Sequence, residues 1–142
     1  MKNLLALALV LLVILTACDN EKVVDETKLP ATAQEFVESH FPAAKITQVV
    51  KDRDNLDIDY DVILDNGVSL VFDKDGNCED IESKTKLPDT VIPLKLLEYV
   101  AANYPDHHII EWEKDKTDQE VKLSNNVELK FNLSGTFLRI DN

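Results

Sequence analysis

The chain has 142 residues with 27 acidic and 15 basic side chains, which gives a formal net charge of −12 at pH 7. A charge of this sign and size disfavours binding to nucleic acid and to anionic lipid surfaces. The length suffices for one compact domain with a hydrophobic core, and two cysteines are too few for a small fold held together by several disulfides.

The N-terminal segment "MKNLLALALVLLVILTACDN" predicts export. Lys2 precedes an apolar run at residues 4–15, which is too short to span a membrane and is followed by a processing site. Residues 15–18, "LTAC", resemble the lipobox of bacterial lipoproteins, in which the cysteine is acylated and becomes the first mature residue. We therefore expect a lipoprotein signal peptide at residues 1–17, lipid attachment at Cys18 and an extracytoplasmic, membrane-anchored protein. Periplasm and cell surface both stay open, and the alternative is an ordinary signal peptide cleaved near Ala17.

The ten residues after Cys18, "DNEKVVDETK", contain few apolar side chains. This composition predicts a flexible tether at residues 18–28 that links the lipid to a folded domain at residues 29–142.

The folded domain contains an internal duplication. "LPATAQEFVESHFPAAKI" at 29–46 parallels "IPLKLLEYVAANYPDHHI" at 92–109 without a gap. "VILDNGVSLVFDKDGNCEDI" at 62–81 parallels "VKLSNNVELKFNLSGTFLRI" at 121–140, with the offset reduced from 63 to 59 residues. The pattern predicts two repeats, at about 29–82 and 87–142.

Each repeat begins with a proline followed by apolar residues at helical spacing, such as Phe36, Val37 and Phe41 in the first repeat. Apolar residues then alternate at 58–64 and 68–72, and the "DNG" at 65–67 is a strong hairpin signal. We predict an α+β fold of two tandem helix-plus-four-strand antiparallel units. The strands are expected in one long sheet or two abutting sheets, covered on one face by the helices.

The stretch "FDKDGNCEDI" at 72–81 gathers carboxylates around one glycine, which raises the question of a cation loop or a redox site. Gly76 aligns with Gly135, but the second repeat keeps the glycine and lacks the carboxylates, which favours a turn with positive φ. The glycine spacing also departs from that of an EF-hand. Cys78 aligns with Phe137 and lacks a neighbouring cation, so we expect a packed, unreactive thiol.

The order "LP…F…FP…I…Y-x-V-x-L-x-N-G-x-x-x-x-F-D-x-x-G" closely resembles the PepSY-like, or β-lactamase-inhibitor-like, domains of bacterial lipoproteins. The resemblance extends over nearly all of residues 29–142. Family members usually place a tryptophan shortly after the turn glycine, where this chain has Cys78 and Phe137. The resemblance implies a secreted or anchored protein without an assigned reaction, and it implies inhibition or peptidase control only by analogy.

Motifs for catalysis are missing from the sequence, which has no G-x-S-x-G turn, no phosphate-binding glycine loop and no C-x-x-C pair. His40, His107 and His108 lack the spacing of helical zinc ligands. We therefore expect no enzymatic activity, no cofactor and no metal site. One alternative is that Asp57, Asp59 and Asp61, at period two on one strand, bind a divalent cation; otherwise they form a solvated face that opposes aggregation.

The expected function is a non-catalytic binding module that recognises an envelope protein or peptide and contacts the membrane only through its lipid. An acidic divalent-cation-binding lipoprotein and, third, a hydrolase with an unrecognised site are the alternatives. Ile63 and Val71 are expected to point outward, and Trp112 joins them if no bulge follows Ile109. These three residues are the candidate partner-binding site, unless a bulge or the tether covers Trp112.

Overall fold

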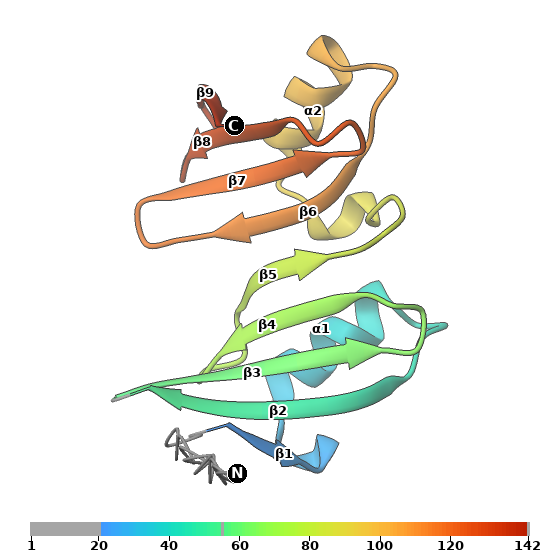
Figure 1. The fold of residues 1–142 in the computed structure, drawn as a ribbon, viewed down its shortest axis with the longest axis vertical. Helices are drawn as coiled ribbons and strands as arrows, with labels where there is room; N and C mark the ends of the chain where they lie inside the picture. The colour runs from blue at the N-terminus through green and yellow to red at the C-terminus, as the bar shows by residue number, and fades with distance from the viewer. Residues whose placement is uncertain (1–20, 55, 142) are drawn as a thin grey trace, which may run out of the picture.

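The computed structural model describes residues 21–54 and 56–141, in which nine strands form one antiparallel sheet (Figure 1). The strands follow one another in chain order from one edge of the sheet to the other. Their bounds are β1 Lys22–Val24, β2 Ile46–Asp54, β3 Asp57–Leu64, β4 Ser69–Asp73, β5 Cys78–Glu82, β6 Ile109–Lys114, β7 Asp118–Leu123, β8 Glu128–Asn132 and β9 Phe137–Asp141.

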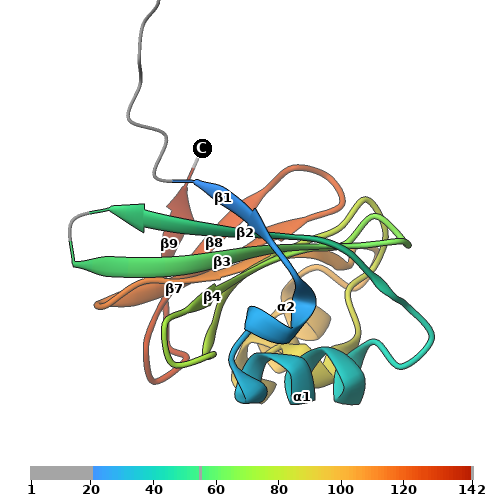
Figure 2. The same ribbon diagram turned by 90° about the horizontal axis from the view of Figure 1, so that it is seen from below.

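Two helices, α1 (Ala31–His40) and α2 (Leu94–Asn103), lie on the same face of the sheet (Figure 2). Pro30 and Pro93 stand at their N-caps, where a missing N–H costs no intrahelical hydrogen bond. A short 3-10 turn precedes each helix, η1 at Glu26–Lys28 and η2 at Asp89–Val91. Among the described residues, neither helix is long and apolar enough to cross a membrane. The opposite face of the sheet carries no helix and is called the open face below.

The hydrophobic core fills the space between the helices and the sheet. Alternate residues of the strands supply it, and Phe72 and Phe131 are both fully buried. Phe36 of α1 packs edge-on against Phe72 with ring centroids 5.6 Å apart, and Tyr99 of α2 packs in the same way against Phe131 at 5.3 Å. Burial of each such side chain contributes about 1.5–3 kcal/mol, so these layers fix the helices on one face.

The expectation of two tandem helix-plus-four-strand units is wrong, because the molecule is mostly a single nine-stranded sheet with two helices. Strands β5 and β6 pair across the expected boundary, with Asp80 opposite Glu113 and Ile81 opposite Trp112. This pairing satisfies backbone groups that two separate sheets would leave exposed at their edges.

Part of the segment expected to be a flexible tether is also ordered. β1 pairs antiparallel with β2, with Val23 opposite Val50 and Val24 opposite Val49. The reason is that β2 would otherwise be an uncovered edge, and two adjacent valines suit a short strand. The expected signal peptide, the expected lipid attachment at Cys18 and the first part of the expected tether, up to residue 20, lie outside the described residues.

The turns confirm the interpretation of the two glycines that align within the chain. Gly76 and Gly135 have φ of 86° and 83°. The Asp73 carboxylate accepts hydrogen bonds from the backbone N–H groups of Asp75 and Asn77, and Asn132 does the same for Ser134 and Thr136 in the second hairpin. The carboxylate of Asp73 therefore builds the turn, as the Asn132 amide does. Burial raises the pKa of the Cys78 thiol to about 12, in keeping with a packed, unreactive cysteine.

Candidate functional site

The open face of the sheet is densely acidic. Side chains reach it from every second position of the strands, opposite the buried ones. Its acidic residues are Asp52, Asp54, Asp57, Asp59, Asp61, Asp73, Asp80, Glu82, Glu111, Glu113, Asp118, Glu120, Glu128 and Asp141. Among the described strand residues, the basic side chains on this face are Lys122, Lys130 and Arg139, all on β7–β9. The part of the face formed by β2–β6 therefore has a strongly negative potential.

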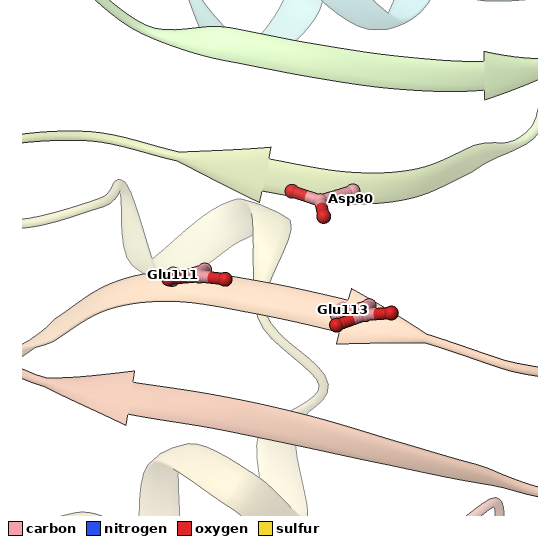
Figure 3. Close-up of side chains that lie close together, drawn as sticks. All are labelled: Asp80, Glu111 and Glu113. Atoms are coloured by element: carbon pink, nitrogen blue, oxygen red, sulfur yellow. The ribbon is translucent and has the colours of Figure 1, made fainter. Parts of the chain in front are cut away.

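Three carboxylates meet where β5 pairs with β6. Oxygen atoms of Asp80, Glu111 and Glu113 all lie within 4.8 Å of one another. Figure 3 shows Asp80 on β5 above the two glutamates, which stand at alternate positions of β6. Asp80 and Glu113 are directly opposite in the register, and Glu111 is opposite Glu82. Like charges at opposed positions destabilise a sheet, so this arrangement has a cost unless something neutralises it.

The electrostatics of the cluster show that cost. Burial, followed by repulsion from Glu111, Glu113, Glu82 and Asp61, raises the pKa of Asp80 to about 7. Burial also raises the pKa of Glu111, although Lys122 opposes the shift from a distance of 3.9 Å. Lys122 lies closer to Glu128, at 3.2 Å, so its charge is shared. The cluster thus keeps a net negative charge that a proton, a metal cation or a cationic group of a partner can neutralise.

The donor set suits a hard cation. Calcium takes six to eight oxygen ligands, and carboxylates are its usual protein donors. Asp80, Glu111 and Glu113 present only carboxylate oxygens, without the cysteine or histidine that zinc prefers. In the described part of the chain, this is the one group of three or more acidic, cysteine or histidine side chains whose ligand atoms lie close enough together to hold one ion.

The acidic residues chosen from the sequence, Asp57, Asp59 and Asp61, do lie along β3, but they do not form such a group. Residues at alternate positions of one strand are about 6.6 Å apart along the chain, whereas opposed residues on neighbouring strands have Cβ atoms about 5 Å apart. Cross-strand neighbours therefore converge more easily than residues of one strand. Finding the cluster from the sequence required the β5–β6 pairing, which no local pattern encodes.

Two of the three expected partner-binding residues lie on the open face. Ile63 on β3 is 41% exposed, and Val71 on β4 is half-buried between Asp61 and Asp80 in the register. Val50 stands opposite Asp61 on the other side. Val71 therefore borders the carboxylate cluster, whereas Ile63 and Val50 lie one and two strands farther from it on the same face.

Trp112 does not join them, because the alternative of a bulge applies: a β-bulge between Ile109 and Glu111 shifts the register and turns the indole to the helix-covered face. Trp112 is only 7% exposed. Its Nε1–H donates to Gln119 Oε1 at 3.2 Å, and Gln119 Nε2 donates to the Asn132 carbonyl at 3.1 Å. Trp112 is thus a core residue with a satisfied polar atom.

The histidines lie away from the open face. His40 contacts the ring of Phe36, and its Nδ1 lies 3.0 Å from the Thr90 hydroxyl. His107 approaches the Ser124 hydroxyl at 3.5 Å. These contacts place the rings in structural roles between helix and loop.

Solved structures of similar proteins come from Bacteroides. A periplasmic protein of the DUF2874 family from Bacteroides vulgatus ATCC 8482 is 42% identical, with 87% of this chain and 98% of that chain covered and a TM-score of 0.83. A "putative calcium-regulated periplasmic protein" from Bacteroides thetaiotaomicron is 41% identical, with 88% and 99% covered and a TM-score of 0.84. Another periplasmic protein of unknown function from Bacteroides vulgatus ATCC 8482 is 30% identical, with 86% and 99% covered and a TM-score of 0.82.

All three are described as periplasmic proteins, which supports an extracytoplasmic location for this chain. No curated protein matches it. The family model described as "Putative beta-lactamase-inhibitor-like, PepSY-like" matches twice, at residues 14–80 and 58–139. The resemblance found in the motifs is thereby confirmed, and the chain belongs to this PepSY-like family.

Proposed function

We propose that this chain is a lipid-anchored, non-catalytic extracytoplasmic module whose open face recognises an envelope protein or peptide under the control of calcium. The observation that carries the proposal is the convergence of Asp80, Glu111 and Glu113 at the centre of that face. One calcium ion bound there removes the repulsion between three carboxylates and changes the charge next to Val71 and on the face that Ile63 shares.

The relative from Bacteroides thetaiotaomicron supports the choice of ion, since it is described as calcium-regulated and covers almost the same length. A flat sheet face supplies no backbone carbonyl loop, so water completes the coordination. We therefore expect an affinity in the range of extracellular calcium modules, about 0.1–1 mM. Such a site responds to changes in calcium outside the cytoplasm.

Calorimetric titration with CaCl2 tests the cation site. The variant Asp80→Asn with Glu113→Gln removes two of the three charged donors, and Asp57→Asn with Asp59→Asn removes the same charge from β3 as a matched control. We expect calcium binding in the unmodified chain and in the control, with loss of the heat signal in the first variant. If both variants lose the heat signal, calcium is held by the general negative charge of the surface. If both variants retain it, the cluster is not the calcium site.

Partner recognition is tested separately by crosslinking in cells with a photoreactive residue in place of Ile63, with and without a calcium chelator. A captured envelope protein whose yield changes with calcium supports the proposal. As a control, the photoreactive residue is placed at Leu94, an exposed position on α2. Capture of the same protein in the same yield from both positions argues against recognition by the open face. Anchoring is tested by metabolic labelling with an alkyne fatty acid, which is expected to label the chain and to fail with Cys18→Ser.

A further inference from the structure

Among the described residues, the final strand, β9, has no neighbouring strand on its outer edge. Two of its five residues are large apolar side chains that are half exposed, Leu138 at 50% and Ile140 at 49%. An exposed apolar edge strand presents backbone groups and side chains that favour pairing with a further strand.

The internal alignment shows what Ile140 lacks. Ile81 is the aligned residue of the first repeat and is 0% exposed, because β6 follows β5 and places Trp112 opposite it. Ile140 pairs with the buried Leu129 on one side, and no strand of the described residues lies on its other side. The same residue type is therefore a core residue at 81 and an uncovered one at 140.

The opposite edge of the sheet is closed differently. β1 pairs with β2 at Val49–Lys51, close to the place on β2 that corresponds to Glu111–Glu113 on β6, where β5 pairs. A segment of the chain itself thus covers that edge. Head-to-tail addition of copies requires displacement of β1, whereas two β9 edges are both available.

We propose that β9 pairs antiparallel with β9 of a second copy, about a two-fold axis at Ile140, so that one sheet runs through both chains. In this register Arg139 of each chain lies opposite Asp141 of the other, and the two Ile140 side chains meet on the helix-covered side. Within one chain Arg139 already pairs with Asp141 at 2.9 Å, so both groups stand on the same face of the strand. A register centred on Arg139 instead opposes two arginines, which is unfavourable.

The charge distribution favours this edge for self-association. The molecule as a whole is strongly negative, which opposes contact between copies over most of its surface. The basic residues of the open face gather near β9, where Lys130 contacts Asp118, Glu120 and Asp141 at 3.5–3.6 Å. Repulsion between two copies is therefore lowest at the β9 edge, and a two-fold contact there closes without forming filaments.

Disulfide crosslinking of the full chain in cells tests the pairing. Ile140→Cys at the two-fold axis is expected to give a dimer band on a non-reducing gel. Leu94→Cys, on the exposed side of α2 at 69% exposure, controls for random collision, and the unmodified chain controls for Cys78. A dimer absent from Ile140→Cys, or equally strong in Leu94→Cys, overturns the proposal. Crosslinking of Ile140→Cys to Val23→Cys in β1 overturns it in favour of head-to-tail pairing.

A charge exchange tests the register. In the Ile140→Cys background, Arg139→Asp alone or Asp141→Arg alone places like charges opposite each other and is expected to reduce the dimer several-fold. Both changes together restore opposite charges and the dimer, as does co-expression of the two single variants. Melting curves of each variant verify the fold. A yield that does not respond to charge, or that fails to recover in the exchanged variant, refutes this register.

Discussion

Gly76→Ala tests how closely the turn before β5 is packed against α1. The glycine has a φ of +86°, and an alanine Cβ at this position comes to 2.9 Å from the Ala33 backbone N and 3.0 Å from the Cβ atoms of Pro30 and Thr32. These atoms belong to the start of α1 and cannot rotate away. Strain at positive φ costs roughly 1–2 kcal/mol, and overpacking adds about 1–3 kcal/mol, so we expect a loss of about 2–5 kcal/mol.

Gly67→Ala is the matched control, because Gly67 has nearly the same φ, +83°, with nothing within 4 Å of the added Cβ. It is expected to lose only the strain, about 1–2 kcal/mol. Urea denaturation followed by circular dichroism measures both, and the midpoint of Gly76→Ala is expected to fall clearly below that of Gly67→Ala. Equal midpoints refute the argument that the hairpin turn at Gly76 packs tightly against the first residues of α1.

Three further changes probe the cluster, the core tryptophan and the turn. The folded-state pKa of Asp80, about 7, lies above its ordinary value of 3.8, so the stability that its protonated form contributes is complete below pH 4 and is lost as the pH rises through 7. Asp80→Asn is therefore expected to raise the free energy of unfolding by about 1–2 kcal/mol at pH 8 without divalent cations, after discount for solvent screening, and to change little at pH 4 in urea titrations. Gln119→Leu removes the acceptor of the buried Trp112 N–H and is expected to cost about 1–3 kcal/mol, while the fluorescence of the unmodified chain shows a buried indole that resists iodide quenching. Asp73→Asn is expected to leave the melting temperature nearly unchanged with or without calcium, since Asn132 makes the same turn contacts; a calcium-dependent rise that the variant loses contradicts this.

Local signals in the sequence predicted the elements well. Pro30 and Pro93 mark the helix starts, and Gly76 and Gly135 take the positive φ that their alignment indicated. These features depend on the conformational limits of proline and glycine, which act within a few residues. They could therefore be deduced without knowledge of the tertiary fold.

Features set by contacts between strands could not be deduced in that way. One extra residue between Ile109 and Trp112 reverses the face of the indole, and a period-two pattern does not reveal a bulge unless the partner strand is known. The pairing of β5 with β6 unites the sheet and brings Asp80 to Glu113. The united sheet and the contact between Asp80 and Glu113 both follow from hydrogen bonding of the backbone groups of β5 and β6, at a boundary where the repeat pattern predicts a break.

The two faces of the sheet relate differently to the internal alignment. On the helix-covered face, several aligned positions keep the same residue, as in Leu70 and Leu129 or Phe72 and Phe131, and all four are buried. On the open face some aligned positions change character, with Val71 aligned to Lys130 and Asp80 to Arg139.

The fold accepts valine or lysine, and acid or base, on that open face, so packing does not dictate those choices. The exchange of Asp80 for Arg139 follows the surroundings of each strand. Asp80 on β5 faces Glu111 and Glu113 on β6 in the proposed cation site, whereas Arg139 stands on the edge strand β9 in the proposed contact between two copies. The open face is therefore the surface on which calcium control is to be sought, and the β9 edge is the place to seek self-association. Substitutions at open-face positions separate function from stability.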